Sequence, residues 1–310
     1  MDKRLLRLYN RCCKQEATKT MSSIFHAVRT ARVIILLLLM VVVSCAPQEV
    51  RLPPKQARVA LVLGAGTSRG FAHIGVLKIL EGNRIPVHMI VGTSAGSFVG
   101  SLYAYGFNAF QLQKIALSID KADIIDYVVP DNGFIKGERL EAYVNNLVQS
   151  TPLEKMRTPF YAVATNVENG REVVFGRGNT GTAVRASCAI PGVFRPVRID
   201  NVMYVDGGVV SPIAVDAARR LGADVVIAVD ISAGIDAKQP EGTIDTILRS
   251  IGIMQSRISE TQLSRADIVI RPKVGGIGAA DFEKRNDAIM EGEKAALEAI
   301  PAIQKLIDNK

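Results

Sequence analysis

Met89-Ile90-Val91-Gly92-Thr93-Ser94-Ala95-Gly96-Ser97 decides the fold of this chain. A short apolar run stops at a glycine, and small residues typical of a closely packed helix follow at once. This order of strand, sharp turn and helix is the signature of a nucleophile elbow, which presents a serine at the turn. Gly92 and Gly96 remove side chains where the strand and the helix approach each other, and they permit a strained backbone. Taken alone, the stretch is equally compatible with an ordinary strand-to-helix turn.

Strand and helix patterns alternate on both sides of the elbow. An apolar strand over residues 58–63 leads through a glycine-rich turn into a helix over residues 71–80, so the first two strands form a parallel βαβ unit. Further helices are expected near residues 108–119, 137–149, 182–189, 213–221, 242–263 and 281–300, and strands near 160–165, 171–175, 197–199, 203–205, 225–229 and 268–270. The pattern predicts one three-layer α/β domain over residues 57–310, with a mostly parallel central sheet and helices on both faces. Residues 108–150 are the candidate lid, because they insert two helices between the elbow and the next strand.

Residues 1–44 have the composition of a secretory leader. Residues 33–43 are wholly apolar but span only about half of a bilayer core of roughly 30 Å, and basic residues precede them. Val42-Val43-Ser44-Cys45 resembles a bacterial lipobox, in which the cysteine is lipidated and becomes the mature N-terminus. A plain signal peptide or an N-terminal membrane anchor is the alternative. Translation from Met21 would leave a leader of ordinary length.

The segment after the leader fits a lipid-anchored protein. Residues 45–56 are rich in Pro, Gln and charge and are predicted to be a lipidated tether that holds the protein at the membrane through Cys45. Ala46 stands where an aspartate would direct retention at the inner membrane, which favours the outer membrane facing the periplasm. Cys188 is the one cysteine of residues 57–310, so that region has no internal disulfide; its apolar surroundings predict a buried small hydrophobe.

The positive charge of the chain does not indicate nucleic-acid binding. Residues 1–44 contain eight Lys and Arg against two acidic residues, so they carry +6 of the formal net charge of +8. The remaining +2 is spread over the rest of the chain, which is close to neutral. A nucleic acid is therefore excluded as a partner.

The glycine loop at residues 64–70 has two competing interpretations. Its glycines, Gly64, Gly66 and Gly70, are one residue too far apart for a dinucleotide fingerprint, and the second strand ends in Gly-Thr-Ser where an acidic residue would hold a ribose. No Lys-Ser/Thr pair completes a P-loop. The better interpretation is an oxyanion hole, in which N–H groups of a tight turn at a helix N-terminus face a developing negative charge.

The candidate donors of this oxyanion hole are the backbone N–H groups of residues 64–67, namely Gly64, Ala65, Gly66 and Thr67. Gly66 and Thr67 are the first choices, with help from Ala65, and the N–H group of Ala95 just after the serine is a further candidate. Arg69 either anchors the loop, attracts an anionic head group or forms a structural ion pair.

The serine lacks the usual histidine base. His26 lies in the leader, and His73 and His88 both precede Ser94, so the Ser-Asp-His order of α/β-hydrolases does not occur in this chain. The helix that carries His73 is expected to run away from the elbow, which makes His73 a polar helix residue with local partners. A serine without a histidine needs another base within hydrogen-bond reach.

Asp206 is the leading candidate for that base. It ends an apolar strand, and Gly207 and Gly208 give it a tight turn with close access to a neighbour. Asp230 is a similar aspartate at the end of a strand, but it lacks the paired glycines. A carboxylate needs partial burial to act as a base near neutral pH, because its ordinary pKa is about 4.

Together the three motifs resemble those of the patatin-like phospholipase family, and most closely those of its short bacterial members. They are the glycine loop ending in Arg69-Gly70, then Gly92-Thr93-Ser94-Ala95-Gly96, then Asp206-Gly207-Gly208. The segments 71–77 and 186–197 agree as well, and the likeness covers residues 57–232. Many relatives carry three consecutive glycines where this chain has Ala65-Gly66-Thr67 or Gly64-Ala65-Gly66, which leaves open which N–H groups face the oxyanion.

The resemblance implies a Ser94–Asp206 dyad that hydrolyses acyl esters of membrane lipids through an acyl-enzyme, with no metal or cofactor. Phospholipase A, lysophospholipase and general esterase activity all remain open. A lipoprotein that uses this fold only for lipid binding or as a scaffold is the alternative function, and a nucleotide-binding enzyme is a weaker one.

Overall fold

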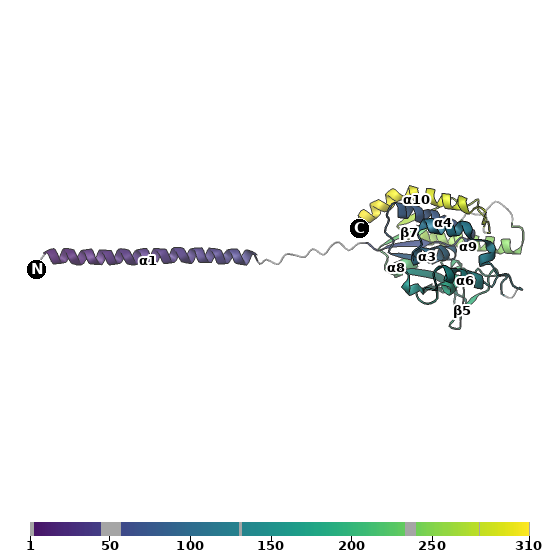
Figure 1. Cartoon of the computed structure of the whole chain (residues 1–310), viewed down its shortest axis with the longest axis horizontal. Helices are drawn as coiled ribbons and strands as arrows, with labels where there is room; N and C mark the ends of the chain where they lie inside the picture. The colour runs from purple at the N-terminus through teal and green to yellow at the C-terminus, as the bar shows by residue number, and fades with distance from the viewer. Residues whose placement is uncertain (1–2, 45–56, 130–131, 233–239, 279, 310) are drawn as a thin grey trace. The chain divides into compact units, whose positions relative to one another are not determined.

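The computed structural model describes residues 3–44, 57–129, 132–232, 240–278 and 280–309. The chain divides into two units, Met1–Lys55 and Gln56–Lys310. In the first unit, helix α1 spans Lys3–Ser44 (Figure 1). Its stretch Thr18–Leu38 is long and apolar enough to cross a membrane, a test that N-terminal signal sequences also pass. The proposed lipidation site Cys45 and the tether over residues 45–56 lie outside the described residues.

The second unit is built on an eight-stranded sheet with the order β5-β6-β3-β2-β1-β7-β8, in which β4 also pairs with β3. The strands are β1 (Val59–Leu63), β2 (Met89–Thr93), β3 (Phe160–Asn166), β4 (Glu172–Phe175), β5 (Val197–Ile199), β6 (Val202–Asp206), β7 (Val225–Val229) and β8 (Ile268–Ile270). The run β3-β2-β1-β7-β8 is parallel, as the βαβ pattern predicts, whereas β4, β5 and β6 pair antiparallel. The central sheet is therefore mostly parallel, with an antiparallel portion at one side.

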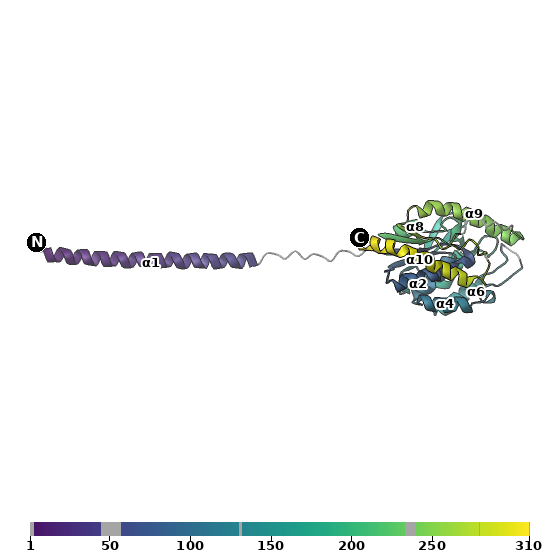
Figure 2. The same ribbon diagram turned by 90° about the horizontal axis from the view of Figure 1, so that it is seen from above.

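Helices cover both faces of this sheet. The α-helices of this unit are α2 (Phe71–Gly82), α3 (Ala95–Tyr105), α4 (Ala109–Ser118), α5 (Lys121–Ile124), α6 (Glu138–Leu147), α7 (Thr180–Ser187), α8 (Val215–Arg220), α9 (Thr243–Leu263) and α10 (Arg285–Asp308); short 3-10 turns are η1 (Thr67–Gly70), η2 (Leu153–Lys155) and η3 (Gly207–Val209). Figure 2 shows α8 and α9 on one side of the molecule and α2, α4 and α6 on the other.

The alternation of side chains along β1 explains these layers. Val59, Leu61 and Leu63 belong to a core shared with α2, α3, α4 and α10, whereas Ala60 and Val62 belong to a core shared with α8 and the end of α9. All five residues of β1 are fully buried. A strand covered on both faces must be apolar at every position, which is why β1 is a continuous apolar run.

Two helices differ from the sequence prediction. The short helix α5 was not expected. Asp120 is its N-cap residue, and the Asp120 backbone N–H donates to Asp123 Oδ2 at 2.8 Å. Hydrophobic periodicity does not reveal such a local cap. Helix α10 was expected over residues 281–300, and a proline disfavours a helix interior. In the structure α10 continues through Pro301 to Asp308, with Ile303 buried in the core beyond the proline.

Helices α2 and α10 pack together through two glycines. A Cβ atom on Gly75 would lie 1.9 Å from the carbonyl oxygen of Ile289, and one on Gly292 would lie 2.0 Å from that of Ala72. Both distances are shorter than any non-bonded contact, so only glycine permits this approach. Helix α2 follows the glycine loop directly, and this packing therefore fixes the element that carries the loop.

Candidate active site

Ser94 lies at a strained turn between β2 and α3. Its φ of 53° and ψ of −122° are in a region that non-glycine residues rarely adopt. The turn is tight: a Cβ on Gly92 would lie 2.5 Å from the carbonyl oxygen of Gly96, and one on Gly96 would lie 2.0 Å from that of Leu63. This is the close approach of strand and helix that the two glycines predict.

Strand β3 brings Ser94 and Asp206 together across 112 positions of sequence. Val163 of β3 pairs with Thr93 at the end of β2, and the next residue, Ala164, pairs with Asp206 at the end of β6. The Ser94 hydroxyl donates to Oδ2 of Asp206 at 2.6 Å. Both side chains are buried, with 4% and 2% of their surfaces exposed.

Burial sets the acidity of the Asp206 carboxyl. Loss of solvation raises its pKa to about 7, although hydrogen bonds from the Ser94 hydroxyl and the Gly208 N–H partly oppose the shift. The Gly208 N–H donates to Oδ1 at 2.7 Å, and Gly207 has no room for a side chain, because its Cβ would lie 2.2 Å from the carbonyl oxygen of Val163. A carboxyl group with a pKa near neutrality has the basicity that general-base chemistry requires.

Ser187 of α7 holds the serine backbone in place and was not predicted from the sequence. Its hydroxyl accepts from the Ser94 N–H at 2.9 Å and donates to the carbonyl oxygen of Val163 at 2.6 Å. The Ser94 N–H is therefore already hydrogen-bonded within the protein, to the Ser187 hydroxyl. Ser187 stands in the 186–197 segment of the family resemblance, but its spacing from Ser94 gives no sign of the contact.

Two of the four residues predicted to form the oxyanion hole use their N–H groups within the protein. The Gly64 N–H donates to Val229 at 3.1 Å and the Ala65 N–H donates to Pro212 at 2.9 Å, both to carbonyl oxygens. Gly64 and Ala65 therefore shape the loop, and the prediction that they donate to an oxyanion was wrong for this geometry. The acceptors of these two N–H groups lie in chain segments that are distant from the loop in sequence.

The remaining candidate donors are the N–H groups of Gly66, Thr67 and Ala95. Within the described part of the chain, the Gly66 N–H has no hydrogen-bond acceptor. Thr67 and Ala95 are the first residues of η1 and α3, where a helix leaves its N–H groups without intrahelical partners. Thr67 has a φ of 55°, so the loop is strained beside the serine. Loop and elbow are in direct contact, since a Cβ on Gly70 would lie 2.6 Å from that of Ala95.

Side chains next to the loop fix its position. Arg69 Nε donates to the carbonyl oxygen of Ile277 at 2.8 Å, and the Ser68 hydroxyl donates to that of Gly278 at 2.7 Å. His73 is fully buried and its Nε2 lies 2.9 Å from the carbonyl oxygen of Gly64; burial lowers its pKa to about 4, so the ring is neutral near pH 7. His73 thus supports the loop, as a residue with local partners, and does not pair with Ser94.

His88 and Asp230 are engaged away from Ser94. His88 Nδ1 accepts from the Val59 N–H at 3.0 Å. Asp230 forms an ion pair with Arg271 at 3.2 Å and accepts from the hydroxyl of Ser232 at 2.5 Å. Neither side chain therefore competes with Asp206 for the serine hydroxyl.

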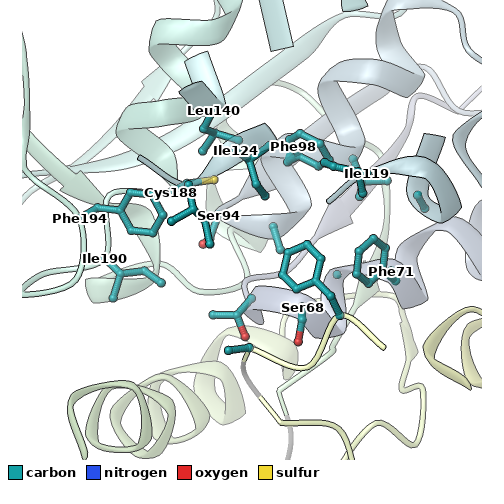
Figure 3. Close-up of a pocket in the computed structure, with 18 of the residues that line it drawn as sticks. Ser68, Phe71, Ser94, Phe98, Ile119, Ile124, Leu140, Cys188, Ile190 and Phe194 are labelled. Carbon is teal, nitrogen blue, oxygen red and sulfur yellow. The ribbon is translucent and has the colours of Figure 1, made fainter. Parts of the chain in front are cut away.

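An apolar cavity of about 250 Å³ opens from Ser94 (Figure 3). Its lining comes from the glycine loop and α2–α6, from the segment 188–194, from α9 and from the residues before α10. The lining side chains include Phe71, Phe98, Leu112, Ala116, Ile119, Ile124, Leu140, Cys188, Ile190, Phe194, Leu248 and Phe282. The candidate lid over residues 108–150 therefore forms a wall of this cavity. Tyr127 and Ile244 also line it and are 74% and 37% exposed, which places them at its rim.

Cys188 lies on this cavity wall, with its Sγ 3.8 Å from the Ser97 hydroxyl. Burial raises the pKa of its thiol to about 12, so the thiol is protonated near neutral pH. A protonated thiol is a poor nucleophile, which fits the interpretation as a small hydrophobe.

A second, polar pocket of about 40 Å³ lies on the Asp206 side of Ser94. Its lining consists of Ala65, Gly66, Thr67, Arg69, Ser94, Ile190, Asp206, Leu248, Ile251, Gly252 and Gln255. Four of these residues belong to α9, which the sequence pattern identified only as a helix. Ser94 thus stands between an apolar cavity and a polar pocket. No cluster of three His, Cys, Asp or Glu with metal-binding geometry occurs among the described residues.

The chain is similar to several known proteins. A family model described as patatin-like phospholipase matches residues 61–219. An uncharacterized NTE family protein of Mycobacterium tuberculosis is 35% identical over 178 residues, which cover 56% of this chain and 49% of that protein. Lysophospholipase NTE1 of Coccidioides immitis is 30% identical over 281 residues, which cover 79% of this chain and 18% of that protein. The chain thus spans about half the length of its mycobacterial relative, and less of its fungal one.

The fold has a counterpart among solved structures. VipD from Legionella pneumophila superposes with a TM-score of 0.57 at 13% identity, over 80% of this chain and 67% of that chain. The family model covers half of the chain and includes all three motifs of the site. The chain belongs to the patatin-like phospholipase family.

Proposed function

We propose that this protein is a serine hydrolase that cleaves acyl ester bonds of membrane lipids. The observation that carries the proposal is the 2.6 Å contact between the Ser94 hydroxyl and the buried Asp206 carboxylate, at the junction of an apolar cavity and a polar pocket. Family membership supports it, and so does the fungal relative that is named a lysophospholipase. Phospholipids and lysophospholipids are both candidate substrates.

In the proposed first step, Asp206 accepts the proton of the Ser94 hydroxyl while Oγ attacks the ester carbonyl carbon. The N–H groups of Gly66, Thr67 and Ala95 stabilise the negative charge on the carbonyl oxygen, as fixed donors do in oxyanion holes. The bond to the alcohol then breaks, Asp206 returns its proton to the leaving oxygen, and an acyl-Ser94 ester remains.

In the second step, a water molecule attacks the acyl-Ser94 ester. Asp206 accepts a proton from the water and then donates it to the departing Ser94 Oγ, which restores the dyad and releases a fatty acid. The apolar cavity accommodates the acyl chain, because its lining offers apolar contacts over several helices.

The direct test is the hydrolysis of defined lipids by purified protein. Vesicles of phosphatidylcholine and micelles of lysophosphatidylcholine are incubated with the protein and with its Ser94→Ala variant, and released fatty acids and lysolipids are measured by mass spectrometry. The proposal requires product formation that depends on Ser94. Equal product formation by the two proteins, or binding of lipid without any product, would instead support the scaffold alternative.

The activity should depend on pH through Asp206. Because burial raises the pKa of Asp206 to about 7, the carboxylate form that accepts the serine proton predominates only above that pH. We therefore expect kcat/KM to rise with pH, to reach half of its maximum near pH 7, and to fall about tenfold for each unit below pH 6. The measurement is kcat/KM for a soluble p-nitrophenyl butyrate between pH 5 and 9. A half-maximum near pH 4 would contradict the role of burial.

The apolar cavity should set the preferred acyl length. Ala116 of α4 is 3% exposed and lines the cavity, so Ala116→Phe would fill space that a long chain needs. We expect turnover of p-nitrophenyl palmitate to fall about tenfold or more, while that of the butyrate ester stays within about twofold. An equal loss for both esters would show damage to the site or the fold rather than a length effect.

We also propose that the protein is lipid-anchored in the bacterial cell envelope through Cys45, at the outer membrane facing the periplasm. The proposal rests on the apolar run at residues 33–43 and on Val42-Val43-Ser44-Cys45, with residues 1–44 as a signal peptide. Cells grown with a palmitate analogue should label the wild-type protein and leave a Cys45→Ser variant unlabelled. Labelling of the variant would contradict the lipobox prediction.

A further inference from the structure

Helix α9 places the side chain of Gln255 beside the proposed base. A Cβ atom on Gly208 would lie 2.2 Å from Gln255 Nε2 and 3.0 Å from Asp206 Oδ1. Gln255 Nε2 and Asp206 Oδ1 are therefore at most about 5 Å apart. One water molecule can bridge that distance with hydrogen bonds to both atoms. Glycine at position 208 is what allows the carboxamide to approach.

Gln255 differs from the other glutamine on the inner side of α9. Gln262 uses its carboxamide within the protein: it accepts from the Ile213 N–H at 3.0 Å and lies 3.2 Å from the Ser211 hydroxyl. The Gln255 side chain is half-buried, lines the polar pocket and makes no hydrogen bond to another described residue. Its hydrogen-bonding groups are therefore available to a molecule in the pocket.

The polar pocket has the size and lining that a water molecule needs. A water requires roughly 10–15 Å³ of accessible space and two to four polar partners. The pocket offers about 40 Å³, with Asp206, Gln255 and Arg69 in its lining. It adjoins Ser94 and Asp206 and shares Thr67, Ser94, Ile190 and Leu248 with the lining of the apolar cavity, which the acyl chain occupies in the proposed acyl-enzyme.

We propose that Gln255 is a catalytic residue of the deacylation step, in which its carboxamide holds the attacking water against Asp206. The inference rests on the proposed function. The water oxygen forms the new bond to the acyl carbon, its proton passes to Asp206, the bond from carbon to Ser94 Oγ breaks, and Oγ receives the proton from Asp206. Gln255 gains and loses no proton. It is not needed for acylation, because the Ser94 hydroxyl already contacts Asp206 directly.

The test separates acylation from deacylation. Gln255→Met keeps the length of the side chain and removes its hydrogen-bonding groups, and Gln255→Ala is a second variant. The matched control is Met254→Ala. Met254 lies one position earlier on α9 and is 56% exposed in the wild type. Rapid mixing with p-nitrophenyl butyrate measures the initial burst of p-nitrophenol and then the steady state. We expect both Gln255 variants to keep the burst rate within about twofold and to lose about tenfold in steady-state turnover, the worth of one hydrogen bond to a reacting group. Intact-mass analysis should then show acyl-Ser94 accumulating, and the control should match the wild type.

Two results would overturn the inference while the proposed function stands. One is a steady-state rate of Gln255→Met equal to that of the wild type. The other is a burst rate that falls in step with the steady state, which would indicate a structural effect. Failure of the proposed function looks different: the wild-type protein would then release no more p-nitrophenol than Ser94→Ala, and the inference about Gln255 would fail with it.

Discussion

Replacing Asp206 with asparagine is expected to lower kcat/KM for p-nitrophenyl butyrate by about 10³-fold or more, because it removes the base that accepts the Ser94 proton. The side chain keeps its shape. The amide oxygen can still accept from the Gly208 N–H, as Oδ1 does at 2.7 Å, but the amide nitrogen would face the Ser94 hydroxyl as a donor. The loss is therefore one of chemistry rather than of structure.

The same substitution should stabilise the protein above pH 7. Burial raises the folded-state pKa of Asp206 to about 7 from an ordinary value of 3.8, so its charged form is less favourable in the folded than in the unfolded protein. When folding raises the pKa of an acid, the neutral acid stabilises the folded state. This contribution is fully present below the unfolded-state pKa and is lost as the pH rises from there through the folded-state pKa. About three pKa units correspond to roughly 4 kcal/mol, as an upper bound.

The wild-type protein is therefore expected to lose stability between pH 4 and 7, whereas Asp206→Asn escapes this loss. At pH 8 the variant should melt several degrees higher than the wild type, and the difference should shrink toward pH 4. Asp230→Asn is the matched control. Asp230 directly follows β7, two strands away from β2 in the sheet, and pairs with Arg271 rather than with Ser94, so its replacement should leave kcat/KM near the wild-type value. An Asp206→Asn variant with wild-type turnover would contradict the dyad.

The second large effect is on the stability of the fold. Gly75→Ala and Gly292→Ala should each reduce the free energy of unfolding by about 2–3 kcal/mol, the usual scale of overpacking. In each case the new methyl group would lie about 2 Å from a backbone carbonyl oxygen of the facing helix, and a backbone cannot move aside as a flexible side chain can. Since α2 follows the glycine loop, both variants should also lose activity.

Gly82→Ala provides the control within α2. A Cβ on Gly82 would meet no atom within 4 Å, so alanine there should be neutral or raise stability by about 0.5–1 kcal/mol, through its better helix propensity. Urea unfolding of the three variants and the wild type measures these differences. If Gly75→Ala and Gly292→Ala were as stable as Gly82→Ala, the close packing of α2 and α10 would be wrong.

The local motifs made much of the site predictable. Gly92 is required by a contact with Gly96, four residues along the elbow, whereas Gly96 and Gly207 are required by close contacts with the distant residues Leu63 and Val163. Their spacing in the motifs nevertheless marks the turns in the sequence. The alternation of strands and helices likewise predicted a mostly parallel sheet with the first two strands parallel, whereas the strand order β3-β2-β1-β7-β8 came from the structure. The pairing of Ser94 with Asp206 came from motif order, because nothing local links two residues 112 positions apart.

The parts that the sequence could not predict depend on distant partners. No local pattern shows that the N–H groups of Gly64 and Ala65 are engaged, but they donate hydrogen bonds to the carbonyl oxygens of Val229 and Pro212. Helical periodicity identified α9 without showing that Gln255 approaches Gly208. The raised pKa of Asp206 also depends on burial by the whole fold, which no motif states.

The central claim is that Ser94 is a nucleophile activated by Asp206. The most direct measurement is covalent labelling with a fluorophosphonate probe at pH 8, followed by peptide mass spectrometry of the wild type and of Asp206→Asn. We expect one probe adduct on Ser94 in the wild type and labelling at least about 10²-fold slower in Asp206→Asn. An unlabelled Ser94 in folded wild-type protein, or equal labelling rates in the two proteins, would contradict it.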